Sequence, residues 1–329
     1  MVDARMPCPK PTARRAPRIV LAALLILTLA GCRPATTGAP EDLAGRPIRV
    51  VATTSMIADL TREIGGERVE VEGLMGPGVD PHLYKASEGD VRRMAEADII
   101  LYSGLHLEGK MTEVFEQMQH RAIRTAALAE EAIPDSMRIA TPVFAGNYDP
   151  HVWFDVRLWM RVAAQLVDVL SDLDPAHANT YATNGHAYER QLASLHAYVD
   201  SLAATVPEQQ RVLITSHDAF GYFGRAYGFE VHGLQGLSTA TEAGTADVQT
   251  LADLVASRKI PAMFVESSVS PRGIEAVRAA VESRGYRVDI GGSLYSDALG
   301  DPNGPEGTYI GTVRYNIETV AGALHPAAR

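Results

Sequence analysis

The tripeptide Asp-Pro-His occurs twice in this chain, at Asp80-Pro81-His82 and at Asp149-Pro150-His151. Each copy follows loop-forming residues, Gly76-Pro77-Gly78 in the first case and Gly146-Asn147-Tyr148 in the second. Proline fixes its own φ angle and favours an extended residue before it, so each histidine is expected on a stiff turn. A stiff turn suits a metal ligand because it holds the imidazole in place before the ion arrives.

Two further side chains are candidates for the same kind of site. His217 follows a strand predicted over residues 211–215, and Asp297 follows one predicted over residues 286–290. Open parallel sheets bind ligands beyond the carboxyl ends of their strands. Three imidazoles and one carboxylate suit Zn²⁺, whereas all-oxygen ligand sets suit Mg²⁺, Ca²⁺ or Mn²⁺. The chain has ten histidines, so the pattern by itself also allows ordinary loop residues.

The elements that must position these residues alternate between strand and helix. Strands are predicted over residues 48–53, 69–74, 98–102, 211–215, 262–266 and 286–290. Helices are predicted over residues 55–64, 87–97, 110–118, 156–170, 248–257, 271–284 and 308–324. A longer helical stretch begins at Asp174-Pro175, a favourable helix start, and runs to about residue 204. This rhythm predicts an α/β protein with parallel sheets, in two halves joined by one long helix.

Length and composition agree with this class. The chain has 329 residues, which suggests about two domains. Hydrophobic residues make up 46% and charged residues 21%, which are ordinary globular values and exclude general disorder. The formal net charge of -10 argues against a broad nucleic-acid-binding surface. The sequence has no GxxxxGK[ST] phosphate loop, so any ATP hydrolysis must occur on another subunit.

The first 31 residues have the pattern of a lipoprotein signal peptide. Basic residues precede an apolar run at residues 19–30, which is too short to cross a bilayer. The next segment, Leu29-Ala30-Gly31-Cys32, resembles a bacterial lipobox. That resemblance implies cleavage before Cys32 and a lipid on its side chain, which would tether the protein to a membrane face. Residues 32–47 are then the lipidated cysteine and a flexible tether.

Five segments carry a more specific resemblance: GPGVDPHLY (76–84), DPHVWFDV (149–156), TSHDAFGYFGRAYGFEV (215–231), FVESS (264–268) and GGSLYSDALG (291–300). Together they resemble the zinc/manganese solute-binding proteins of bacterial ABC importers, the TroA-like and ZnuA-like families. The resemblance covers residues 48–324. It implies two Rossmann-like lobes, with central parallel sheets flanked by helices, bridged by one long rigid helix. It also implies four metal ligands: His82, His151, His217 and Asp297.

The third ligand position separates members of this family. Manganese-dedicated members resemble this chain but carry Glu where it has His217, whereas zinc members and mixed members carry His. Many dedicated zinc members also have a long His- and acid-rich loop in the first lobe. Residues 107–119, which follow His106, contain no such loop. Through His217, the resemblance favours Zn²⁺ as the cargo. The missing loop leaves Mn²⁺ as the alternative.

The expected function is that of an extracytoplasmic solute-binding protein without catalytic activity. It would capture a divalent transition metal between its lobes and deliver it to an ABC permease whose ATPase is a separate subunit. The expected location is the periplasm or the outer face of the cytoplasmic membrane, with the monomeric protein anchored by lipid at Cys32. The expected organisation is a signal peptide at 1–31, a tether at 32–47, an N-terminal lobe at 48–173, a bridging helix at 174–206 and a C-terminal lobe at 207–329.

A secreted zinc-dependent hydrolase is the competing hypothesis. Catalytic zinc usually keeps three protein ligands and one open position for water, so four protein ligands disfavour catalysis. The sequence contains no HExxH motif. In a hydrolase, Glu266 or Asp297 would serve as the general base. Glu266 ends a predicted strand, and it has two open interpretations: it orients a ligand histidine from behind, or it caps the following turn.

Overall fold

The computed structural model describes residues 43–140 and 147–325. The predicted signal peptide and Cys32 lie outside the described residues, as does most of the predicted tether. Across the two described ranges, none of the helices combines the length and apolar character that a bilayer span requires.

The N-terminal part of the described chain is built on one parallel sheet. Its strands are β1 (Ile48–Ala52), β2 (Val69–Gly73), β3 (Ile99–Tyr102) and β4 (Arg124–Ala127), in the order β2-β1-β3-β4. Its helices are α2 (Ser55–Gly65), α3 (Glu88–Glu96), α4 (Thr112–His120) and α5 (Leu128–Ala132). Local capping defines these helices: the Thr54 hydroxyl accepts from the backbone N–H of Ile57, and α3 begins with a capping box of Ser87 and Asp90.

The C-terminal part contains two parallel strand pairs. One pairs β5 (Val212–His217) with β6 (Glu230–Gln235), and the other pairs β7 (Ala262–Glu266) with β8 (Asp289–Leu294). Strands β5 and β7 also lie against each other. The helices here are α8 (Gly221–Tyr227), α9 (Thr245–Arg258), α10 (Arg272–Ser283) and α11 (Tyr309–Leu324).

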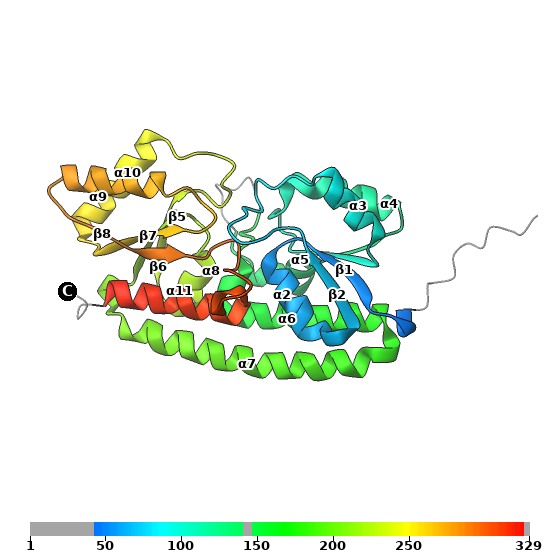
Figure 1. The fold of residues 1–329 in the computed structure, drawn as a ribbon. Coiled ribbons are helices and arrows are strands. Elements are labelled where there is room, and N and C mark those ends of the chain that lie inside the picture. The colour runs from blue at the N-terminus through cyan, green and yellow to red at the C-terminus, as the bar shows by residue number, and fades with distance from the viewer. Residues whose placement is uncertain (1–42, 141–146, 326–329) are drawn as a thin grey trace, which may run out of the picture. The chain divides into compact units, whose positions relative to one another are not determined.

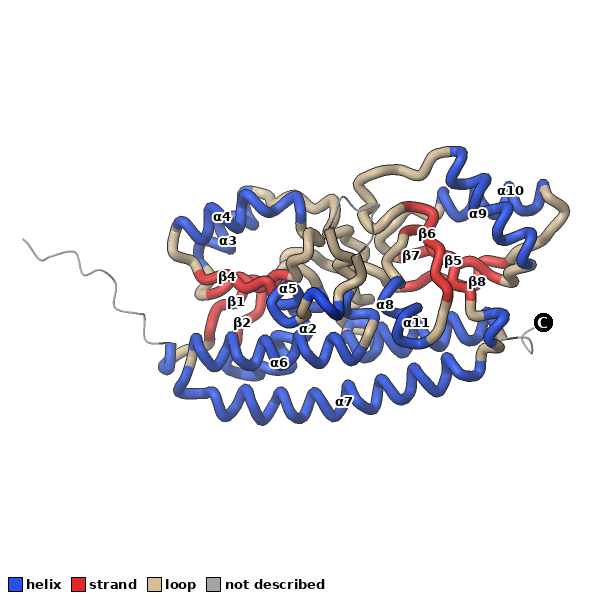
Figure 2. Tube along the Cα trace, turned by 180° about the vertical axis from the view of Figure 1, so that it is seen from behind, coloured by secondary structure: helices blue, strands red, loops and turns tan. Residues whose placement is uncertain are grey.

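Two long helices connect the parts. Helix α6 (Val156–Leu173) is followed by the short 3-10 turn η7 (Pro175–His177) and then by α7 (Ala178–Thr205), which has 28 residues. Helix α7 packs against α2 and α6 at one end and against α11 at the other, so it runs below the strands of both parts (Figures 1 and 2). Gly185 allows α6 and α7 to approach closely, since a Cβ atom there would lie 2.5 Å from Val167 Cγ2.

The predicted α/β class, its parallel sheets and its long helix are confirmed. Two predicted strands have other bounds in the structure, and two observed strands, β4 and β6, were not predicted. Strand β5 continues through His217, so this histidine ends the strand instead of following it. Strand β6 was not predicted because Gly233 interrupts its pattern, yet any Cβ there would lie 2.3 Å from Asp218 N. Strand β8 begins later and extends further than predicted, because Gly291 must pass the ring of Phe264.

Candidate metal centre

The structure brings His82, His151, His217 and Asp297 into one buried cluster, here called the four-residue cluster. One possible ligand atom from each residue lies within 4.8 Å of the others. His151 and His217 have no exposed surface, Asp297 is 1% exposed and His82 is 4% exposed. These are the residues that the family resemblance implied, and they come from four separate segments of the chain.

Each part of the molecule supplies two members of the cluster. His82 lies in the loop between β2 and α3, and His151 directly precedes the 3-10 turn η6 (Val152–Phe154). His217 is the last residue of β5, and Asp297 follows β8. The last two therefore lie beyond the carboxyl ends of parallel strands, where open α/β sheets place their ligands.

The distances between ligand atoms match a tetrahedral ion site. His151 Nε2 lies 3.3 Å from His82 Nε2, 3.4 Å from His217 Nε2 and 3.5 Å from Asp297 Oδ1. His217 Nε2 lies 3.4 Å from Asp297 Oδ2. In a tetrahedral zinc site with bonds of about 2.0–2.1 Å, neighbouring ligand atoms are separated by about 3.4 Å. These four separations therefore fit an ion of that size.

Carboxylates behind two of the histidines orient their rings. His151 Nδ1 donates to Asp149 Oδ1 at 2.8 Å, and His217 Nδ1 donates to Glu266 Oε2 at 2.5 Å. With the proton on Nδ1, each Nε2 atom carries a lone pair that points into the cluster. Glu266 Oε1 also accepts the backbone N–H of His217 at 2.9 Å. Of the two interpretations of Glu266, the structure therefore supports the one in which it contacts a histidine from behind.

The charge of Asp297 fits a cation site. Burial opposes ionisation of this carboxyl, but His217, His151 and His82 around it hold its pKa well below the ordinary value. Its Oδ1 atom is buried and accepts no hydrogen bond, while Oδ2 accepts from the Ser268 hydroxyl at 3.3 Å. A buried carboxylate oxygen without a donor is costly, and a bound cation would satisfy it.

His82 and His217 differ in their affinity for protons. Burial lowers the pKa of His82 to about 3, so its ring is neutral, as a metal ligand must be. Burial also opposes protonation of His217, but the carboxylates of Glu266 and Asp297 outweigh it and raise the pKa of His217 well above the usual value.

Sequence reasoning missed the role of Asp149, although a signal was present. The aspartate of each Asp-Pro-His tripeptide lies two residues before its histidine, close enough to contact it. Trp153 is buried beside this site as expected: its ring lies 5.2 Å from that of His151, and its Nε1 donates to the carbonyl of Ser296 at 3.0 Å.

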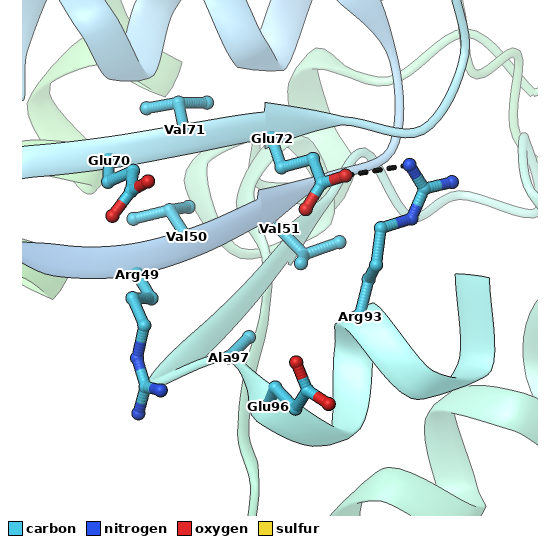
Figure 3. Close-up of a pocket in the computed structure, with 9 residues that line it drawn as sticks. All are labelled: Arg49, Val50, Val51, Glu70, Val71, Glu72, Arg93, Glu96 and Ala97. Atoms are coloured by element: carbon cyan, nitrogen blue, oxygen red, sulfur yellow. Dashed lines mark hydrogen bonds and ion pairs between the residues drawn. The ribbon is translucent and has the colours of Figure 1, made fainter. Parts of the chain in front are cut away.

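A separate hollow of about 350 Å³ lies on the N-terminal sheet beside α3 (Figure 3). Valines line it together with charged side chains of both signs, and the ion pair between Arg93 and Glu72, 2.7 Å long, lies at its edge. Its lining contains no histidine and no member of the four-residue cluster. The hollow is therefore separate from the four-residue cluster.

Comparison with known proteins agrees with this geometry. The profile of the family described as zinc-uptake complex component A, periplasmic, matches residues 50–323. This chain belongs to that family. The zinc-binding protein TroA of Treponema pallidum is 48% identical over 307 residues, which cover 93% of this chain and 98% of the relative. The manganese-binding lipoprotein MntA of Bacillus subtilis is 46% identical over 308 residues, which cover 93% and 98%.

The structural likeness within the family is equally extensive. The solved structure of the periplasmic zinc-binding protein TroA from Treponema pallidum matches with a TM-score of 0.82 at 49% identity, covering 84% of this chain and 99% of that chain. A more distant member, the manganese ABC transporter substrate-binding lipoprotein PsaA of Streptococcus pneumoniae, is 28% identical over 291 residues, covering 88% and 93%. The resemblance to zinc/manganese solute-binding proteins is thus confirmed. None of these relatives is described as a hydrolase, so that hypothesis gains no support.

Proposed function

We propose that this family member binds one divalent transition-metal ion through His82, His151, His217 and Asp297 and delivers it to an ABC permease. One observation carries the assignment. Three buried histidines, two of them oriented by carboxylates, share one cluster with the Asp297 carboxylate, and His151 Nε2 lies 3.3 to 3.5 Å from a ligand atom of each of the other three residues. Without a cation, Oδ1 of Asp297 stays buried with no donor, at a cost in folding free energy.

Zinc is the ion that we favour. The ligand set is rich in nitrogen, its spacing matches zinc–nitrogen bond lengths, and the position that is Glu in manganese-dedicated relatives is His217 here. Affinity at such sites generally follows the Irving–Williams order, which places Zn²⁺ above Mn²⁺. Manganese is the alternative, since MntA, which binds manganese by name, is nearly as similar to this chain as TroA.

The cellular setting that we propose follows the same relatives. MntA and PsaA are named as lipoproteins, which supports a signal peptide at residues 1–31 and a lipid at Cys32. The protein would then act outside the cytoplasmic membrane as a monomer, with no catalytic role. We further propose lobes at 48–173 and 207–329, joined by a bridging segment at 174–206, that close around the ion.

Metal analysis and competitive titration of the purified protein test this function. Wild type should bind one equivalent of Zn²⁺ tightly. His217→Ala should lose most of that affinity, because it removes one of four ligands. His217→Glu should shift the preference toward Mn²⁺, because it replaces nitrogen with oxygen.

A metal-free wild type, or an affinity that neither substitution changes, would reject the assignment. Hydrolase activity provides a separate check with Asp297→Ala. A binding protein loses metal affinity in this variant, whereas a hydrolase with three histidine ligands would keep its metal and lose turnover.

A further inference from the structure

One hydrogen bond ties the loop that carries His82 to the C-terminal part of the molecule. Thr239 Oγ1 donates to Asp80 Oδ2 at 2.5 Å, and Thr239 is only 8% exposed in the segment between β6 and α9. The other oxygen of Asp80 accepts the backbone N–H of His82 at 2.8 Å. A single carboxylate therefore links a residue of the opposite part directly to the turn that positions His82.

His82 is otherwise the least restrained member of the four-residue cluster. The rings of His151 and His217 are held by carboxylates at Nδ1, whereas no hydrogen bond to Nδ1 of His82 is found within the described part of the chain. Residues 76–87 around it form neither helix nor strand. The next side chain, Leu83, is 49% exposed and is the only large apolar side chain that is exposed among the described residues.

The two residues of this hydrogen bond also line a cleft whose walls include neighbours of the four-residue cluster. This cleft, of about 370 Å³, is lined by Asp80 and Leu83 from one part and by Thr239, Ser216 and Ser268 from the other. Ser216 directly precedes His217, and the Ser268 hydroxyl contacts Asp297. The lining of the cleft thus includes residues that contact or adjoin three members of the four-residue cluster, and its two walls are joined by the bond from Thr239 to Asp80.

We infer that this bond is a latch, which holds His82 against the bound ion and sets the rate at which the ion dissociates. Thr239 acts as a positioning residue: it touches no ion, but its hydroxyl keeps the His82 loop closed over the cleft. When the latch breaks, the His82 loop can separate from the C-terminal part, and the ion loses its most accessible ligand first. The inference rests on the proposed function, because it presupposes an ion in the four-residue cluster.

The test is the dissociation rate of Zn²⁺ from the purified full chain, measured by stopped-flow mixing of the loaded protein with excess chelator. Trp153, beside His151, provides a fluorescence signal. Thr239→Val keeps the shape of the side chain and removes the donor, so it should raise the dissociation rate about five- to tenfold, the usual net effect of one hydrogen bond. Thr239→Ser restores the hydroxyl and should restore a slow rate.

A matched control and a double-mutant cycle separate the latch from a general packing role. Thr241 lies two residues further in the same segment and is exposed, and its hydroxyl makes no hydrogen bond within the described residues, so Thr241→Val should leave the rate unchanged. Asp80→Ala should speed dissociation by itself, and adding Thr239→Val to it should have no further effect.

The outcomes are distinct for the two hypotheses. If wild type binds no Zn²⁺, the proposed function itself fails. If wild type binds Zn²⁺ but Thr239→Val dissociates at the wild-type rate, or Thr239→Ser is as fast as Thr239→Val, the latch is rejected while the metal site stands. Additive effects of the Asp80 and Thr239 substitutions would also reject it.

Discussion

The two Asp-Pro-His tripeptides have the same sequence and the same turn, but they hold their histidines in different ways. In both, the aspartate Oδ1 accepts the backbone N–H of the histidine, at 2.8 Å for His82 and 2.9 Å for His151. At the second copy, Asp149 also accepts from the ring of its own histidine. At the first copy, the second oxygen of Asp80 instead reaches across to Thr239.

Their surroundings widen this difference. The second copy is embedded: Asp149 is 1% exposed, and its backbone carbonyl accepts the hydroxyl of Tyr222 at 3.0 Å. The first copy is followed by the exposed side chain of Leu83. The local Asp-Pro-His motif thus determines the turn, while the residues packed around it determine whether the turn is fixed or can open. A transport protein needs both kinds, because it must bind an ion and later release it.

The largest expected effect on zinc affinity comes from replacing the histidine of each copy with alanine. A structural zinc site contributes about 10–16 kcal/mol in all, so the loss of one ligand of four should cost roughly 100- to 1,000-fold in affinity. His151→Ala should fall at the upper end, because His151 Nε2 lies within 3.5 Å of a ligand atom from each of the other three residues. His82→Ala should fall at the lower end. Competitive zinc titration measures both.

The exposed His186→Ala on α7 serves as the control and should bind like wild type. If His82→Ala proves the more damaging variant, the idea that the second copy is the fixed anchor of the site is wrong.

The residues packed behind the second copy should make the stability of the fold depend on pH. The backbone N–H of Tyr309 donates to Asp59 at 2.9 Å, and the hydroxyl of Tyr309 donates to the carbonyl of Trp153, beside His151, at 2.6 Å. Burial raises the pKa of Asp59 to about 6 from 3.8. Because the folded value lies above the unfolded one, this group stabilises the fold most below pH 4, and that contribution is lost as the pH rises through about 6.

Asp59→Asn keeps the acceptor and removes the titration. Relative to this variant, wild type should lose up to about 3 kcal/mol of unfolding free energy between pH 4 and pH 7. Urea unfolding of the metal-free proteins at several pH values measures the difference. If the difference in unfolding free energy between the two proteins stays constant with pH, ionisation of Asp59 does not destabilise the fold and the prediction is wrong.

The smallest expected effect is the difference in zinc affinity between variants that remove Asp149 and Asp80. Asp149→Ala and Asp80→Ala both lose the bond to the histidine backbone, so their difference compares the bond between Asp149 and the His151 ring with the bond between Asp80 and Thr239. Loss of such a partner typically costs 10- to 100-fold in metal affinity. Asp149→Ala should therefore weaken equilibrium zinc binding by that factor, while Asp80→Ala should weaken it less, by about the factor by which it accelerates dissociation.

Asp149→Asn retains an acceptor oxygen and should recover part of the affinity. Equal equilibrium losses for the two alanine variants would contradict the distinction drawn here between the two copies.

Much of this protein was predictable from its sequence because the relevant signals are local. Alternating strand and helix patterns predicted the α/β class, and the Asp174-Pro175 start predicted the long helix that is observed as α7 after a short 3-10 turn. Histidine and aspartate in the family's motifs pointed to the four-residue cluster. Proline and aspartate determine each Asp-Pro-His turn within a few residues, so both turns form in the same way.

Only the tertiary structure decided what these local pieces do together. Strand β6 escaped prediction and the bounds of β8 were shifted, and in both strands a glycine makes a close approach to a distant residue, Asp218 or Phe264, which no local pattern reveals. The distant partner of Asp80 was equally hidden. Thr239 lies 159 positions from Asp80 in the chain, and the contact exists only because folding packs the β6–α9 segment against the His82 loop. A hydrogen bond is short-ranged, so its partner is set by where the fold places each group and not by the motif that carries it.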